Sequence, residues 1–431
     1  MIRWQGVAAL APRSESGGRR TLVVFEDQGW RALRPLTDLL PVPALRFGAS
    51  DLAGRWHLHT GLPIMAIAAR PEAMACWREA PRPEAARAES QDELVVVNAA
   101  ALPGPWLGEA MAARSPALWV SGERVAGARV SFPVLAARLE GGGSDFETFL
   151  RDLDLPTVPV LAEWLTHPWD LVERNADAIR LDLEPLHGLR EGEVHRLAAL
   201  EEPERITIEP GARVDAYAVL DARPGPIHLA AGAEVLPHTV VTGPCAVGQG
   251  TQLLGGSIGF SSIGPVCRIL GEVDSSLWQG WANKRHHGFV GHSVVGEWVN
   301  LGALTTTSDL KNNYGEVRVW VDGAERPSGL RKIGAFLGAH VRTGIGTLLP
   351  TGVVVGVGSN LFGGGRFAPK HVPAFAWWDG GRVDEHRLEK FMETARLAMA
   401  RRERPLSSAD ETALRALFDA TAADRAAART A

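Results

Sequence analysis

The chain has 431 residues, of which 45% are hydrophobic and 22% are charged, and its formal net charge at pH 7 is −5. This balance excludes a strongly basic nucleic-acid binder, and the length is sufficient for two domains with hydrophobic cores. Three cysteines show neither disulfide-framework nor metal-finger spacing. No apolar run approaches the roughly 18 residues of a membrane span, and no signal-peptide pattern is evident. We therefore expect a cytoplasmic protein without a membrane span.

Short β-branched runs alternate with helical segments over the first 185 residues. The expected strands are Thr21–Phe25, Leu94–Val97 and Ala117–Val120, and Pro159–Glu184 has a helical pattern that is broken at Pro168. This alternation predicts an α/β domain whose ligands lie at the carboxyl ends of its strands.

Polar residues after the first expected strand are candidates for a nucleotide site. Glu26 and Asp27 either hold Mg²⁺ at the strand end or form a solvated acidic turn, and both interpretations stay open. Arg34 and Arg46 are candidate phosphate contacts. No glycine-rich phosphate loop follows the strand, and Gly141–Gly143 is interpreted as a plain loop.

A six-residue period begins near Arg205. The two series with this step are Leu229, Val235, Val241, Val247, Leu253, and Ile333, Ala339, Ile345, Thr351, Val357. The second is accompanied in step by Gly334, His340, Gly346, Gly352 and Gly358. This period fits neither a helix nor simple strand alternation and is typical of a hexapeptide-repeat β-helix. We predict an all-β left-handed parallel β-helix, an exception to the right-handed crossover rule, whose stacked coils bury a continuous core.

The repeat is interrupted between about Leu270 and Arg331. This stretch contains His286, His287, Lys284, Lys311, Asn300, Asn312, Asn313 and Tyr314. Loops on a rigid scaffold are where binding and catalytic residues concentrate. The alternative, ordinary surface loops and turn-forming asparagines on a non-catalytic scaffold, stays open.

Several segments carry a family resemblance. In the repeat region they are IEPGARV (Ile208–Val214), GPIHLAAGAEV (Gly225–Val235), TGPCAVGQGT (Thr242–Thr251), Gly271–Ala303, LKNNYGEV (Leu310–Val317) and Gly346–Gly365. In the N-terminal half they are VVFED (Val23–Asp27), Leu33–Gly48, VVNAAALP (Val96–Pro103) and HPWDLVERNADAI (His167–Ile179). The chain resembles the family related to bifunctional N-acetylglucosamine-1-phosphate uridyltransferase/glucosamine-1-phosphate N-acetyltransferase, and most closely its branch of sugar nucleotidyltransferases.

The resemblance implies a domain organisation and a set of ligands. It implies an N-terminal nucleotidyltransferase-like domain and a C-terminal acetyltransferase domain. With the repeat and helix patterns, we place these domains over residues 1–185 and 205–370, with a linker over 186–204 and a helical tail over 371–431. The resemblance also implies a homotrimer that takes acetyl-CoA, an amino-sugar phosphate such as glucosamine 1-phosphate, and UTP with Mg²⁺ where the first domain is active. The expected pathway is UDP-N-acetylglucosamine biosynthesis.

The resemblance also assigns individual residues. It makes His286 the general base and Ala303 an acetyl-CoA contact, while Lys284, Arg268, Asn300, Asn313 and Tyr314 bind the amino-sugar phosphate. Asp27, Arg34 and Arg46 remain the weaker candidates for the nucleotide site, with Asp27 as the metal ligand. The sequence departs from the branch at His287, where an acid is usual, and at Leu40, where an arginine is common.

Acetyl transfer to an amine requires a base for the amine proton and donors for the tetrahedral oxyanion. A histidine can accept a proton near neutral pH, and the cations beside His286 favour its neutral form. A backbone N–H near Ala303 is the expected oxyanion donor. The open alternatives are a single-activity acyltransferase or nucleotidyltransferase, a non-catalytic scaffold or sensor, and a zinc hydratase that uses His287 and His292.

The tail is predicted to be helical. A helix that begins near Asp384 is broken by Pro405, and Ser407 or Ser408 caps a second helix through Leu417. Residues Ala420–Ala431 are expected to be frayed.

Overall fold

The computed structural model describes residues 19–77, 92–140, 145–185 and 188–430. The predicted loop at Gly141–Gly143 lies outside these residues. Two compact units are present: one contains residues up to 31, 40–45 and 50–166, and the other contains residues 32–39, 46–49 and 167 onward.

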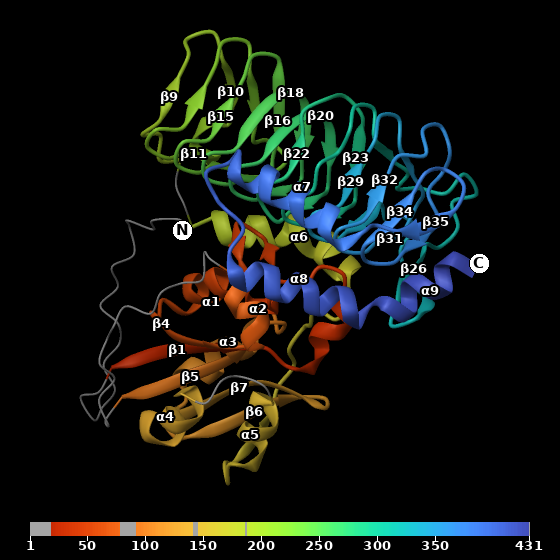
Figure 1. Ribbon diagram of the computed structural model, residues 1–431. Helices are drawn as coiled ribbons and strands as arrows, with labels where there is room; N and C mark the ends of the chain where they lie inside the picture. Colours follow the sequence, from red (N-terminus) through yellow and green to blue (C-terminus); the bar gives the residue numbers. More distant parts are fainter. Residues whose placement is uncertain (1–18, 78–91, 141–144, 186–187, 431) are drawn as a thin grey trace. The chain divides into compact units, whose positions relative to one another are not determined.

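The first unit is built on a six-stranded sheet with the strand order β4–β1–β5–β7–β6–β8 (Figure 1). The strands are β1 (Arg20–Phe25), β4 (Ile64–Ala68), β5 (Glu93–Asn98), β6 (Ala117–Ser121), β7 (Arg124–Ser131) and β8 (Thr157–Pro159). Its helices are α1 (Leu52–Thr60), α2 (Pro71–Cys76), α3 (Pro105–Ala112), α4 (Phe132–Glu140) and α5 (Phe146–Asp152). Strands β4, β1 and β5 are parallel and β7 is antiparallel to β5, so the α/β prediction for this part is confirmed.

The helix predicted over Pro159–Glu184 is shorter than expected. Helix α6 (Pro168–Leu183) begins at the proline that was predicted to break it. Proline is favoured in the first turn because that position needs no N–H donor. The Asp170 carboxylate accepts the His167 N–H at 2.8 Å and caps the same end. The preceding residues are extended in β8 and in the bridge between Ala101 and Trp164.

The second unit is a parallel β-helix over residues 193–378, which confirms the predicted fold class (Figure 1). One face consists of β11 (Ile206–Ile208), β14 (Ile227–Leu229), β17 (Cys245–Val247), β19 (Ser262–Ile263), β21 (Leu277–Trp278), β24 (Val294–Val295), β28 (Ala335–Leu337), β31 (Val353–Val355) and β33 (His371–Val372). The coils begin before residue 205 and continue past residue 370, because the outermost strands pair in register without the apolar six-step pattern.

Two further faces complete the coils, and the long strands β18 (Gln252–Gly259) and β20 (Arg268–Asp274) contribute to both. The second face contains β9 (Glu193–Val194), β12 (Arg213–Val214), β15 (Glu234–Val235), β22 (Asn283–Lys284), β29 (Arg342–Thr343), β32 (Asn360–Leu361) and β34 (Ala376–Trp378). The third contains β10 (Ala199–Glu201), β13 (Val219–Asp221), β16 (Thr239–Thr242), β23 (Phe289–Gly291), β25 (Thr306–Thr307) and β30 (Leu348–Leu349).

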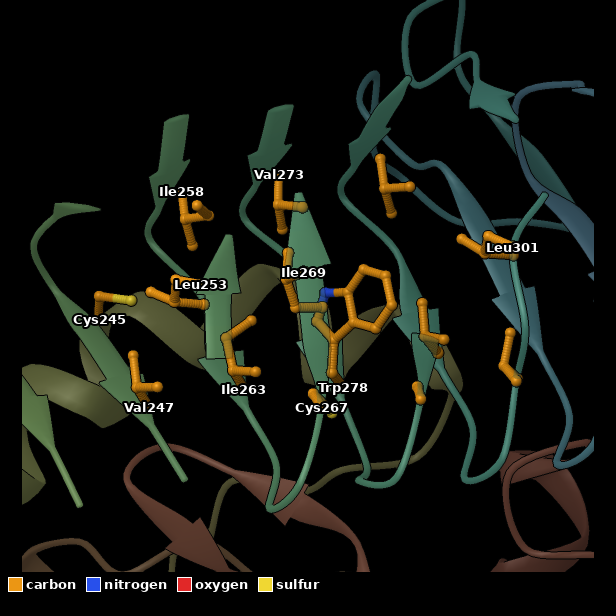
Figure 2. Packing of buried hydrophobic residues seen from close by; sticks show 14 of the residues in the cluster. Cys245, Val247, Leu253, Ile258, Ile263, Cys267, Ile269, Val273, Trp278 and Leu301 are labelled. Atoms are coloured by element: carbon orange, nitrogen blue, oxygen red, sulfur yellow. The ribbon is translucent and has the colours of Figure 1, made fainter. Parts of the chain in front are cut away.

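Inward side chains form one continuous core along the coils. Figure 2 shows Val247, Ile263 and Trp278 following one another along successive strands of this core. All five residues of the first predicted series are no more than 1% exposed. The phase of the second series is wrong, because Ile345 is 74% exposed at a corner. The row with this step that faces the core of the β-helix contains Leu337, Leu349, Val355 and Leu361, with Thr343 at the remaining position. Ile333 and Val357 are buried as well, but they do not belong to this core.

The glycines of the second series occupy corners with a left-handed backbone. Gly346, Gly352 and Gly358 have φ near 70°, and His340 adopts φ of 61° at the equivalent step. Trp281 and Trp298 lie at the same corner as His340, on other coils, and have the same backbone conformation. Their rings stack at 5.0 Å, and those of Trp298 and His340 stack at 6.3 Å. These rings form a ladder along one edge of the β-helix.

The C-terminal helices pack against this edge. They are α7 (Leu388–Ala400), α8 (Ser408–Ala420) and α9 (Ala422–Thr430). Phe391 of α7 contacts the rings of His340 and Phe375 at 5.7 and 5.1 Å, and Ser407 caps α8 as predicted. The frayed end predicted for Ala420–Ala431 is instead helical over α9, where Arg425 pairs with Glu385 at 3.1 Å. Among the described residues, no helix has the length and apolar character to cross a membrane.

Candidate functional site

His286 lies at a corner of the β-helix, in the turn between β22 and β23. The side chains of Arg285, His286 and His287 are all exposed. Gly288 closes the turn with φ of 133°, and a Cβ there would lie 2.2 Å from the carbonyl oxygen of Thr305. The turn therefore presents three consecutive polar side chains to solvent from a rigid coil.

Two predicted ligand residues lie on the coil that follows. The Leu304 N–H donates to the carbonyl oxygen of His287 at 2.9 Å, so Ala303 lies at the same corner one coil further on. Asn300 precedes this corner on the second face. The structure thus brings His286, Asn300 and Ala303 together on neighbouring coils.

A polar strip leads along the second face to this corner. Arg268, Asn283, Asn300 and Arg342 are register partners on successive strands. The Asn283 Nδ2 donates to Asn300 Oδ1 at 2.8 Å. Burial lowers the pKa of the Arg342 guanidinium. Of the predicted ligand residues, Arg268 and Asn300 therefore share one outward-facing row.

Lys284 points into the coil and is only 1% exposed. Its Nζ donates to the carbonyl oxygens of Leu270 at 2.7 Å and His286 at 2.9 Å. Burial lowers the pKa of the ammonium to about 8, and attraction by Glu272 opposes this shift. The expectation that Lys284 binds a sugar phosphate is corrected by this placement, because strand alternation turns the side chain inward and main-chain carbonyls occupy its amine.

Asn313 and Tyr314 lie elsewhere on the chain, in the excursion between β25 and β28. This excursion contains a hairpin of β26 (Arg318–Val321) and β27 (Ala324–Pro327). Asn313 Oδ1 accepts the Gly315 N–H at 3.0 Å, which is a turn-forming contact, and Tyr314 is 67% exposed with φ of 55°. Strand β23 separates the corner that leads to this excursion from the corner with His286. One chain by itself does not bring these residues to His286.

A histidine–aspartate pair lies at the base of this excursion. His292 Nδ1 is 2.8 Å from Asp309 Oδ2. Burial raises the pKa of Asp309, but the hydrogen bond and charge of His292 outweigh it and hold that pKa below its usual value. His287 and His292 lie at opposite ends of β23. Within the described part of the chain, no three metal-binding side chains gather, so the zinc hydratase alternative finds no ligand set there.

Asp27 lies at the carboxyl edge of the sheet in the first unit and is 6% exposed. Its carboxylate accepts Arg124 Nε at 2.9 Å, Asn98 Nδ2 at 2.8 Å and the Gly29 N–H at 2.9 Å. The Arg124 guanidinium lies 3.9 Å from the ring centroid of Trp164. Protein donors surround the Asp27 carboxylate in this structure, so its role as an Mg²⁺ ligand stays a prediction that requires these partners to be exchanged. A solvated acidic turn is wrong, because the residue is buried.

Glu26 is paired in the same way and is 5% exposed. Its carboxylate accepts Arg70 Nε at 2.7 Å and the Val42 N–H at 2.6 Å, and the Arg70 guanidinium lies 3.7 Å from the ring centroid of Trp30. Arginines from distant parts of the sequence therefore neutralise both acids, and no motif in the sequence indicates this pairing.

The two predicted phosphate contacts, Arg34 and Arg46, belong to the second unit. Arg34 Nε bonds Asp38 Oδ1 at 2.5 Å. The Arg46 backbone N–H donates to Gln279 Oε1 at 2.7 Å, and its Nη1 contacts the carbonyl oxygen of Ala49 at 3.4 Å. Each arginine therefore has a protein partner in this structure.

These features define a protein in which a nucleotidyltransferase-like α/β domain precedes a parallel β-helix with an exposed corner histidine. Residues 22–191 match the family described as sugar nucleotidyl transferase. The chain is related to a bifunctional sugar-1-phosphate nucleotidylyltransferase/acetyltransferase of Sulfurisphaera tokodaii, with 41% identity over 93 residues, and to the bifunctional protein GlmU of Paracidovorax citrulli, with 31% identity over 184 residues. The predicted resemblance is thereby confirmed.

These matches are partial. They cover 22% and 40% of this chain, and 23% and 33% of the two relatives. Among solved structures, an N-acyltransferase from Bacillus cereus in complex with dTDP and coenzyme A aligns with 48% of this chain and 88% of its own, at 13% identity and a TM-score of 0.17.

The buried Lys284 amine provides one prediction. Lys284→Met keeps an apolar stem but removes the donor to two buried carbonyls, so we expect the free energy of unfolding at pH 7 to fall by about 1–3 kcal/mol in urea denaturation. Because folding lowers the pKa of this lysine, the unfolded chain binds more protons between about pH 8 and 10. The stability of the wild type relative to the variant should therefore rise through that window.

Lys311→Met is the matched control, because the Lys311 amine bonds one exposed carbonyl, that of Glu316. We expect it to change the free energy of unfolding by less than about 0.5 kcal/mol, both at pH 7 and between about pH 8 and 10. A difference between wild type and Lys284→Met that does not change with pH would contradict the titration of Lys284.

The Asp27 cluster provides a second prediction. Arg124→Met leaves a buried carboxylate without its counter-charge and should lower the free energy of unfolding of this unit by about 3 kcal/mol. Arg151→Met removes the more exposed pair with Glu147 and should cost less than about 1 kcal/mol. Adding Asp27→Asn to Arg124→Met should recover most of the loss, and a double variant as unstable as the single one would refute the ion-pair explanation.

Proposed function

We propose that this chain transfers the acetyl group of acetyl-CoA to the amine of an amino-sugar phosphate such as glucosamine 1-phosphate, with His286 as the general base. The observation that carries the proposal is the exposed His286 on a rigid corner, next to Asn300 and Ala303 on the following coil. The partial relative from Sulfurisphaera tokodaii supports it, because its name includes acetyltransferase.

The reaction follows from this arrangement. The amine of the sugar attacks the thioester carbonyl while the imidazole of His286 takes its proton. A backbone N–H near Ala303 donates to the oxyanion of the tetrahedral intermediate. Its collapse breaks the carbon–sulfur bond, and the thiolate leaves and receives a proton. Lys284 contributes indirectly, since its bond to the His286 carbonyl fixes the main chain of the turn.

A homotrimer is part of the proposal. Asn313 and Tyr314 extend from a different corner of the same chain and cannot complete a pocket at His286 by themselves. Clefts between the prisms of neighbouring subunits would bring the exposed Tyr314 of one copy to the His286 corner of the next. The polar strip with Arg268 and Asn300 would then form the other wall.

Replacing His286 tests the base directly. His286→Ala should lower kcat for thiol release by about 10²–10⁴-fold, because a positioned base contributes that factor. His287→Ala is the matched control, since it removes a neighbouring imidazole that is also exposed, and it should leave the rate within about twofold. Unchanged thiol release in His286→Ala would show that the base is another group.

A thiol-reactive dye is suitable for this assay. Burial raises the pKa of the Cys245 thiol to about 12 and that of Cys267 to about 11. These two thiols should therefore react slowly, and most background should come from Cys76.

A second activity, nucleotidyl transfer by the first unit, is favoured by the family match over residues 22–191. We propose a diverged domain, because Asp27 and Glu26 are already paired with arginines and would have to exchange them for Mg²⁺. We expect pyrophosphate release from UTP and a sugar 1-phosphate to be slower than thiol release and to vanish with EDTA. Release at an equal or higher rate would refute the divergence, and no release at all would leave a single-activity acyltransferase.

A further inference from the structure

Two arginines that are far apart in the sequence converge on one turn of the β-helix. Arg268 of β20 donates through Nη1 to the carbonyl oxygens of Gly250 and Cys267, both at 2.9 Å. Arg402 follows the C-terminal end of α7, and its Nη1 contacts the carbonyl oxygen of Val266 at 3.5 Å. The two guanidiniums therefore bind carbonyls on adjacent residues of one corner.

Arg285 is the third cation of this group. It lies two residues after Asn283, which is the register partner of Arg268, so both Asn283 and Arg285 face outward. Burial lowers the pKa of Arg268, and repulsion from Arg402 and Arg285 lowers it further. Burial also lowers the pKa of Arg402, and Arg285 contributes there too. The three charges are close enough to repel one another.

No carboxylate neutralises this group within the described part of the chain. None of the three arginines forms an ion pair there, although the structure pairs many other arginines with acids. Glu234 attracts Arg268, but its carboxylate is bonded by Arg213 at 3.3 Å and Gln252 at 3.1 Å. Three cations without a counter-ion raise the free energy of the folded chain, and a bound anion would reverse this.

Arg402 is held in place by the docking of the tail on the aromatic ladder. Figure 1 shows α7 lying along the coils. The guanidinium of Arg404 lies 4.7 Å from the ring centroid of Trp281, and Phe391 contacts His340 and Phe375 at the other end of the helix. The tail therefore delivers a cation to a defined position.

We propose that Arg268, Arg285 and Arg402 form a binding site for a phosphate ester, and that the tail helix is a functional part of the site. This rests on the proposed acetyl transfer in one respect: Arg285 precedes His286, so the ligand would be a phosphorylated substrate of that reaction. Guanidinium groups suit this role because their N–H pairs match phosphate oxygens. The phosphate belongs either to the amino sugar or to coenzyme A.

Calorimetric titration of the full-length protein with glucosamine 1-phosphate and, separately, with coenzyme A tests the site and distinguishes the two sources. Arg402→Gln should weaken binding of one of the two by about tenfold or more, which is typical of a lost charged hydrogen bond. Glucosamine and pantetheine, which lack the phosphates, should show no dependence on Arg402. Arg401→Gln is the control, because it removes the same charge from an exposed adjacent residue and should change affinity by less than about twofold.

Three results would overturn the proposal. The first is an unchanged affinity of Arg402→Gln for both ligands. The second is no binding of either ligand to the wild type at millimolar concentration. The third is an altered oligomeric mass of Arg402→Gln with both affinities retained, which would make the cluster a subunit contact. Binding is measured without turnover. Arg402-dependent binding together with absent thiol release would therefore refute acetyl transfer and leave the phosphate site standing.

Discussion

The closure of each β-helix coil is the constraint on which the second unit depends. The chain must turn at a corner every few residues, and many of these turns require a left-handed backbone. Glycine meets this need at Gly346, Gly352 and Gly358. Trp281 and Trp298 accept the strained conformation instead, and their stacked rings return some of its cost through contact with each other and with the tail.

The sequence predicts the period of the coils better than their phase. A step of six is visible because inward positions recur at equal intervals, and Leu229 to Leu253 are buried as expected. The same step at Ile333 to Val357 marks corners rather than core, since an apolar residue such as Ile345 can stand at an exposed corner without breaking the repeat. The pattern of hydrophobic residues gives the six-residue spacing of the coils. Which residue of each six points inward depends on how neighbouring coils stack.

The residues of the candidate site also differ in how far the sequence predicts their positions. His286, Asn300 and Ala303 come together because residues 17 apart stack on neighbouring coils here, as the bond between Asn283 and Asn300 shows. The six-residue step is interrupted in this stretch, so the residues alone do not give this stacking. The partners of Asp27 and Glu26 cannot be read from the sequence either, because Arg124 and Arg70 reach them across long sequence separations. The position of Arg402 depends on the docking of a helix, and no motif in its own neighbourhood indicates this contact.

Lys284 also affects which amino acids the turn after it can contain. Regular corners are held by main-chain hydrogen bonds between coils, which restrict the residues that fit there. At this turn an ammonium inside the coil supplies two of the donors, bridging Leu270 of one coil to His286 of the next. Arg285, His286 and His287 have no side-chain part in this bracing, so their identities can change without loosening the coil. Because the buried Lys284 ammonium holds this turn, residues 285–287 can be selected for their chemistry without affecting how the coil folds.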